Sequence, residues 1–163
     1  MTKLHTFSAL WDKYPDYVNY PKPEAVKALI GGAVDADWIE NTCAIRLSRT
    51  LNYNGFPIPA SFAGLNTVRG GDGKRYAFRV RELRPWLVYR FGRPDFDVTK
   101  KQGEDFDKGS LALVKGIIGF DIRFADATGH LDLWDGSSFT HEYQTSGEYW
   151  SGATRLSVWR ASA

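Results

Sequence analysis

A single cysteine and three histidines supply the residue types that could carry nucleophilic chemistry in this chain of 163 residues. Cys43 lies where the surrounding pattern predicts the first turn of a helix, with Asn41 or Thr42 as the N-cap. The backbone N–H groups of such a turn have no partner within the helix, and the helix dipole favours a negative charge there. A thiol in this position is therefore a candidate nucleophile, because the thiolate is its reactive form.

A nucleophilic thiol needs a base within hydrogen-bond reach, and two histidines, His130 and His141, flank the pair Asp135-Gly136. This pair favours a two-residue turn between strands of alternating polarity. Such a turn places His130 directly opposite His141, with their Cβ atoms roughly 4.5 to 5.5 Å apart. We therefore expect His130 to take the proton of Cys43, and His141 to hold the imidazole of His130 in the required tautomer.

Other interpretations of the same residues stay open. Asp132 lies on the same strand face as His130 and could orient it, although residues two apart along a strand are separated by roughly 6.6 to 6.8 Å, which favours His141. A zinc ion could also be bound by Cys43, His130, His141 and Asp132. No pair of them has a recognised zinc spacing, however, and a metal would compete with the thiolate, so we expect neither metal nor cofactor. Cys43 could instead be an inert core thiol, and the histidines could be exposed neighbours.

Helical signals dominate the first half of the chain. Apolar residues at helical spacing, a proline at a helix start and glycines at helix ends predict four helices. They are expected over 7–14, 23–30, 41–51 and 83–92. Pro85 fits only near the first turn of the last of these. Residues 52–75 carry Asn, Gly and Pro with little periodicity, which predicts a long surface loop.

Strand signals follow in the second half. A central strand is expected over 117–124, a hairpin over 129–134 and 137–143, and further strand over 148–150 and 156–159. Helices followed by an antiparallel sheet make an α+β fold. Because no repeat and no linker interrupts the chain, we expect residues 1–163 to form a single catalytic domain.

The composition excludes several classes of protein. Hydrophobic residues at 43% and charged residues at 25% are typical of an ordinary globular domain. The net charge of +2 is too small to indicate a nucleic-acid-binding surface, so we expect no nucleic-acid partner. No window approaches the 18 apolar residues of a membrane span, and the first residues lack the apolar core of a signal peptide. We expect synthesis in the cytoplasm without a signal peptide, and no membrane insertion.

The candidate residues also carry a resemblance to a known family. The stretches that carry it are Asn41–Ser48, Leu51-Asn52, Gly55–Ile58, Arg79-Val80, Gly92–Asp95 and Gly129–Gly136. Together, and in this order, they resemble the type VI secretion amidase effectors of family 4. That family is similar in fold to papain-like, NlpC-type cell-wall endopeptidases, in which a helix bearing the cysteine packs on an antiparallel sheet bearing the histidine.

The resemblance implies an amidase that cuts peptidoglycan stem peptides between D-glutamate and meso-diaminopimelate. It also implies delivery by the type VI secretion machinery into the periplasm of a Gram-negative rival, and a cognate immunity protein that occludes the cleft. The sequence departs from the family at one point, because His141 stands where the family has an aspartate at the third catalytic place. The set Cys43, His130 and His141 is similar instead to the broader NlpC-type pattern.

Two other functions fit the same sequence. A cysteine with two histidines could serve an acyltransferase or a transglutaminase-like enzyme, in which an amine and not water captures the acyl group. A non-catalytic binding domain could use the aromatic residues, which make up 15% of the chain, as a contact surface.

Overall fold

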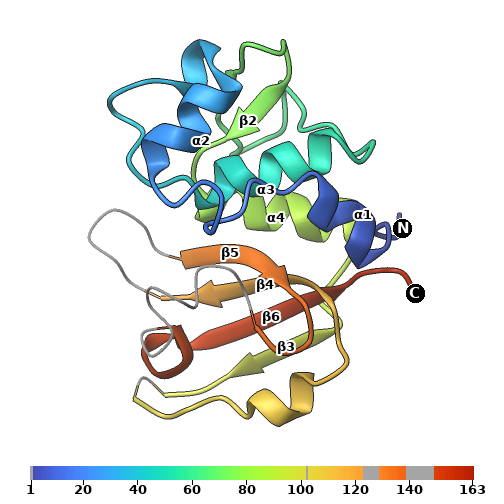
Figure 1. The fold of residues 1–163 in the computed structure, drawn as a ribbon. Coiled ribbons are helices and arrows are strands. Elements are labelled where there is room, and N and C mark those ends of the chain that lie inside the picture. Colours follow the sequence, from blue (N-terminus) through green and yellow to red (C-terminus); the bar gives the residue numbers. More distant parts are fainter. Residues whose placement is uncertain (1, 102, 123–128, 139–148) are drawn as a thin grey trace.

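The computed structural model describes residues 2–101, 103–122, 129–138 and 149–163, and it places a helical layer beside an antiparallel sheet (Figure 1). The helical layer holds α1 (Phe7–Asp12), α2 (Pro23–Ile30), η1 (Gly32–Val34), α3 (Cys43–Asn52) and α4 (Val80–Phe91), with a hairpin of β1 (Thr67–Arg69) and β2 (Arg75–Ala77). The sheet holds β3 (Phe96–Thr99), β4 (Gly116–Asp121), β5 (Gly129–Trp134) and β6 (Arg155–Arg160), and η2 (Lys108–Leu111) precedes β4. This is the α+β architecture that the sequence predicts.

The order of the strands brings β5 to the helices. Every neighbouring pair in the order β3-β6-β4-β5 is antiparallel, so β4 is paired on both sides, as expected for the central strand. In Figure 1, β5 lies at the side of the sheet that faces α3 and α4. Both helices contact β5, so the residues of this strand meet residues of α3 that are far away in the sequence.

Helix α3 is buried over almost its whole surface. Leu47 and Leu51 lie one turn apart on it and are fully buried in the same core cluster as Leu131 and Leu133 of β5. Burying a leucine side chain contributes roughly 1.5 to 3 kcal/mol, so these contacts hold the helix firmly against the strand. The helix can therefore fix the position of a side chain at its own first residue.

Alternation along β5 gives its two faces different partners. Leu131 and Leu133 point into the cluster shared with α3, whereas Trp134 belongs to a second cluster on the opposite face of the sheet. That second cluster includes Phe120, Tyr149 and other apolar residues of β4, β6 and the segment before β6. His130 and Asp132 share the face of Trp134, because side chains two residues apart lie on the same side of a strand.

Several expected elements differ in the structure. Residues 52–75 are not one loop, because they hold β1 and the first residue of β2. The backbone of this hairpin packs on the end of α2, where the Gly71 N–H donates to Ile30 O at 3.0 Å. Each strand of the hairpin has three residues, which is too short to show a periodicity, and the contact that holds the hairpin is long-range in the sequence. The polar strand β3 was not predicted either. Residues 149 and 150, where further strand was expected, lie in a helical turn over 149–152.

Helix α4 begins earlier than expected, at Val80, so Pro85 lies inside the helix and not in its first turn. A proline there removes the hydrogen bond that its N–H would make to the preceding turn. The packing of Leu83, Trp86 and Leu87 in the main core keeps the helix intact across that gap. Among the described helices, none has the length and apolar character that crossing a bilayer requires.

We expect Gly116→Ala to destabilise the protein by about 2 kcal/mol or more, because the added Cβ would overlap the backbone carbonyl oxygen of Trp159 on β6. Gly119 lies on the same strand, and a Cβ there would meet the flexible side chain of Leu131 at 3.1 Å. Gly119→Ala is therefore the matched control, with an expected loss of about 1 kcal/mol or less. Urea unfolding measures both, and equal midpoints for the two variants would contradict this packing.

Candidate active site

The first residue of α3 is Cys43, and its surroundings match those of a thiol at a helix N-terminus. The N-cap residue Thr42 makes no side-chain cap, and the Cys43 N–H donates instead to Asn41 Oδ1 at 2.9 Å. Thr42 is thus the N-cap residue, one of the two that the sequence predicts, and Asn41 supplies a side-chain acceptor to the first turn. The thiol is buried, with 4% of the residue exposed.

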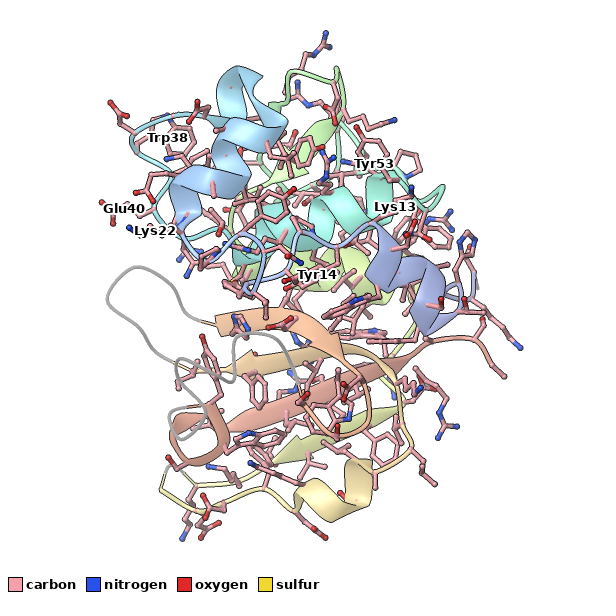
Figure 2. The ribbon with its side chains drawn as sticks, in the orientation of Figure 1. Lys13, Tyr14, Lys22, Trp38, Glu40 and Tyr53 are labelled. Carbon is pink, nitrogen blue, oxygen red and sulfur yellow. The ribbon has the colours of Figure 1, made fainter. Side chains whose placement is uncertain are left out.

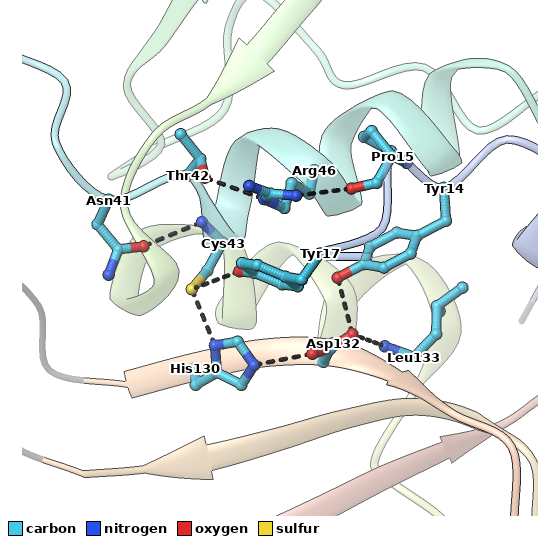
Figure 3. A network of polar contacts seen from close by, with 10 residues as sticks. All are labelled: Tyr14, Pro15, Tyr17, Asn41, Thr42, Cys43, Arg46, His130, Asp132 and Leu133. Carbon is cyan, nitrogen blue, oxygen red and sulfur yellow. Dashed lines mark hydrogen bonds and ion pairs between the residues drawn. The ribbon is translucent and has the colours of Figure 1, made fainter. Parts of the chain in front are cut away.

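His130 of β5 meets this thiol. The distance between Cys43 Sγ and His130 Nδ1 is 2.8 Å, across 87 residues of sequence (Figure 3). The histidine is fully buried, and its ring stacks on Tyr149 with the ring centroids 4.4 Å apart and an angle of 8° between the planes. The structure therefore brings together a thiol and an imidazole in direct hydrogen-bond contact, which is the contact that a nucleophile and its base require.

The other ring nitrogen of His130 faces a carboxylate. Nε2 lies 3.0 Å from Asp132 Oδ2, and the exposed fraction of both residues is 0%. This contact contradicts the expectation that spacing along the strand disfavours Asp132. That spacing separates Cα atoms, whereas side chains on one strand face lean along the strand and can meet. Asp132 therefore occupies the position of a group that orients the imidazole.

The turn after β5 also differs from the expected one. The Asp135 N–H donates to Ser138 O at 3.1 Å, so the turn is centred on Gly136 and Ser137 and not on Asp135-Gly136. Asp135 Oδ1 accepts the N–H groups of Ser137 and Ser138, which holds the turn in this form. His141 lies outside the described residues, so its expected place opposite His130 stays a prediction.

The geometry does not support the zinc alternative for Cys43, His130 and Asp132. The thiol contacts Nδ1 and the carboxylate contacts Nε2, so the two lie on opposite sides of one imidazole ring. A metal ion binds only one nitrogen of a given ring and cannot take both groups as its other ligands. Within the residues that the structure describes, no group of three or more His, Cys, Asp or Glu side chains is arranged to hold a metal.

Burial and charge act against each other at the thiol–imidazole pair. Burial raises the pKa of Cys43, but the charge of His130 and hydrogen bonds from His130 and Tyr17 outweigh it, and the net pKa lies below the ordinary 9.0. Burial lowers the pKa of His130, but the Cys43 charge and the hydrogen bonds to Asp132 and Cys43 raise it to about 10. Each charge therefore stabilises the other, so the contact favours the thiolate–imidazolium form.

Three residues at the site were not predicted from the sequence. The Tyr17 hydroxyl lies 3.5 Å from Cys43 Sγ, and the Tyr14 hydroxyl donates to Asp132 Oδ1 at 2.7 Å. Arg46, one turn after Cys43 on α3, covers the Tyr17 ring with its guanidinium carbon 3.8 Å from the ring centroid. Only the spacing of Tyr14 gave a signal, and it indicated a core-facing helical residue.

A thiol in hydrogen-bond contact with an imidazole, at the tip of a helix packed on an antiparallel sheet, defines a papain-like, NlpC-type cysteine hydrolase. The family model of the type VI secretion system (T6SS) amidase effector protein 4, Tae4, matches residues 39–159. The chain belongs to this family and is a peptidoglycan amidase of the T6SS.

Solved structures agree over nearly the whole chain. Tae4 in the Tae4–Tai4 effector–immunity complex from Enterobacter cloacae is 32% identical, with a TM-score of 0.83 over 99% of this chain and 100% of that chain. Tae4 from Salmonella typhimurium in its complex with Tai4 is 26% identical, with a TM-score of 0.81 over 97% of this chain and 99% of that chain. A comparison with curated proteins gave no match.

We expect the thiol of Cys43 to ionise below pH 9.0, because the imidazolium stabilises the thiolate more than burial destabilises it. Thiolate absorbance near 240 nm measures this directly, since Cys43 is the only cysteine and Cys43→Ala gives an exact blank. In His130→Ala, burial remains while the cation is lost, so the midpoint should move above that of the wild type. An unchanged midpoint in His130→Ala would exclude the ion pair.

Proposed function

We propose that this amidase cleaves peptidoglycan stem peptides between D-glutamate and meso-diaminopimelate, with Cys43 as nucleophile and His130 as acid and base. The observation that carries this proposal is the 2.8 Å contact between Cys43 Sγ and His130 Nδ1. The choice of bond rests on membership of the Tae4 family and on the resemblance of the chain's motifs to that family. The segment of Tyr14 and Tyr17, the start of α3, strand β5 and Tyr149 before β6 come together around this contact, which supports a single catalytic domain over 1–163.

In the first half of the reaction, the Cys43 thiolate attacks the carbonyl carbon of the amide and forms a tetrahedral intermediate. The C–N bond then breaks, and the Nδ1–H of His130 gives its proton to the departing amine of meso-diaminopimelate. The product is a thioester between Cys43 and the acyl group of D-glutamate. The raised pKa of His130 keeps it protonated at neutral pH, so the acid is in the form that this step needs.

In the second half, the neutral His130 takes a proton from water, and the resulting hydroxide attacks the thioester. The carboxylic acid leaves and the Cys43 thiolate returns, with the proton back on His130. Asp132 stays bonded to Nε2 throughout, so the ring presents Nδ1 to the reacting atoms in both halves.

The oxyanion of the intermediate forms beside the start of α3, where backbone N–H groups point out of the helix. The Cys43 N–H is bonded to Asn41 Oδ1 in the free enzyme. For this N–H to serve the intermediate, the oxyanion replaces Asn41 Oδ1 as its acceptor. Removing one oxyanion donor costs roughly 3 to 4 kcal/mol of barrier, so the exchange matters for the rate.

We further propose that the T6SS delivers the protein into the periplasm of Gram-negative target cells. The solved Tae4 relatives from Enterobacter cloacae and Salmonella typhimurium are described in complex with the immunity protein Tai4. By the same relationship, a cognate immunity protein of this kind is the expected inhibitor of this chain. Its binding should be measurable with purified partners and should abolish the release of muropeptides.

We expect Cys43→Ala to abolish cleavage of purified Gram-negative sacculi while leaving the melting temperature nearly unchanged. The substitution removes the nucleophile but only one sulfur atom from the core. Mass spectrometry of the digested sacculi reports both the reaction and the bond. Undiminished product would reject the mechanism, and products that carry an added amine in place of a free carboxyl group would identify an acyltransferase.

Kinetics decides which residue orients His130. We expect Asp132→Asn to lower kcat/KM about 100-fold, because an amide cannot hold the imidazolium as a carboxylate does. His141→Ala should lower it less than His130→Ala, since an orienting group assists the base without replacing it. Full activity of Asp132→Asn beside a large loss in His141→Ala would assign the orienting role to His141 alone.

A further inference from the structure

Tyr14 makes a direct contact with the carboxylate that faces the catalytic histidine. Its hydroxyl donates to Asp132 Oδ1 at 2.7 Å, across 118 residues of sequence. Tyr14 is 5% exposed and Asp132 is fully buried. Figure 2 shows Tyr14 between the helical layer and β5, and Figure 3 shows its hydroxyl pointing at the carboxylate.

The two oxygens of Asp132 have different partners. Oδ2 lies 3.0 Å from His130 Nε2, while Oδ1 accepts the Tyr14 hydroxyl and the Leu133 N–H, the latter at 2.8 Å. The terminal torsion of an aspartate is broad, so the side chain does not fix the carboxylate plane by itself. Two donors on Oδ1 fix that plane and aim Oδ2 at the imidazole.

We propose that Tyr14 is a positioning residue for the amidase reaction, which acts by holding the Asp132 carboxylate against His130. This inference rests on the orienting role of Asp132 in the proposed function. It concerns a residue outside 39–159, the part of the chain that the family model matches.

The segment around Tyr14 is tied to the helix that carries the nucleophile. Pro15 O accepts a hydrogen bond from Arg46 Nη1 at 2.9 Å, and Arg46 Nε donates to Thr42 Oγ1 at 3.0 Å. The Tyr14 N–H is bonded to Trp11 O, and its ring packs in the main core. Tyr14 is therefore held from the α3 side while its hydroxyl reaches β5, so it fixes the carboxylate relative to Cys43.

The phenol is a permanent donor. Burial raises the pKa of Tyr14 well above 10, and the charge of Asp132 and the hydrogen bond to it raise it further. The hydroxyl is therefore protonated at neutral pH and can donate to the carboxylate. Water cannot take over this role at a fully buried carboxylate, so loss of the hydroxyl leaves Asp132 short of one donor.

The test is a double-mutant cycle on a defined soluble muropeptide, with Tyr14→Phe, Asp132→Asn and the double variant. We expect Tyr14→Phe to lower kcat about tenfold and to change KM by less than about twofold, because the hydroxyl acts on the base and not on the substrate. In the Asp132→Asn background, the same change should alter kcat by less than about twofold, since the group through which Tyr14 acts is already lost.

Tyr76→Phe is the matched control. It removes another hydroxyl from a buried tyrosine ring that donates to an aspartate, Asp72 Oδ2 at 2.6 Å, in a separate core cluster. We expect its kcat to equal that of the wild type. Melting temperatures of all variants show that each is folded at the assay temperature.

The outcomes distinguish a failure of the role proposed for Tyr14 from a failure of the proposed function. Wild-type kcat in Tyr14→Phe beside a low kcat in Asp132→Asn overturns the role of Tyr14 and leaves the proposed function standing. Losses that add up in the double variant also overturn it, because Tyr14 would then act elsewhere. Wild-type kcat in Asp132→Asn overturns both the orienting role of Asp132 and the inference built on it.

If Tyr14→Phe does not fold, proton NMR of the wild type and of Asp132→Asn tests the hydrogen bond of the Tyr14 hydroxyl directly. The hydroxyl proton of Tyr14 is expected as a slowly exchanging downfield signal that moves upfield in Asp132→Asn. A wild-type hydroxyl proton that exchanges rapidly with water and shows no downfield shift would show that no such hydrogen bond exists in solution, and would overturn the proposal.

Discussion

Burial penalises a charge on Cys43 or His130 taken alone, so the site depends on both being charged together within 2.8 Å of each other. Two opposite charges about 4 Å apart near a protein surface attract by about 4 kcal/mol, and closer contact strengthens this attraction. The attraction outweighs burial for both groups, since the pKa of the thiol is lowered and that of the imidazole is raised. A small increase in their separation would therefore favour the neutral pair and remove the thiolate.

The architecture provides that separation by joining two rigid elements. The thiol is fixed at the first residue of α3, and the imidazole is fixed on β5, whose leucines pack in the same core as the leucines of α3. Stacking on Tyr149 holds the plane of the His130 ring, and Asp132 holds its rotation from the other nitrogen. Each part of the pair is thus restrained by packing as well as by hydrogen bonds, which is what preorganisation requires.

The sequence predicted the parts of this site that have local signals. Capping residues and apolar spacing located the helix that begins at Cys43, and the alternation from Gly129 to Trp134 located the strand of His130. The partner of His130 Nε2 could not be predicted in this way. Whether Asp132 reaches the ring depends on the direction in which the side chains lean along the strand, and not on the spacing of the Cα atoms. Tyr14 was also out of reach, since a contact across 118 residues depends on how the layers pack.

Arg46 illustrates why the site cannot be explained by stability alone. It is fully buried, it faces backbone, hydroxyl and ring partners, and among the described residues its Nη2 has no hydrogen-bond partner. A buried guanidinium with an unpaired donor destabilises a fold compared with an apolar residue of similar size. Burial raises the pKa of Tyr17, and the Arg46 charge opposes that rise, so its field reaches the residue that contacts Cys43. Its contribution is therefore geometric and electrostatic: it fastens the segment of Tyr14 and Tyr17 to α3, and it places a positive charge beside the tyrosine that contacts Cys43.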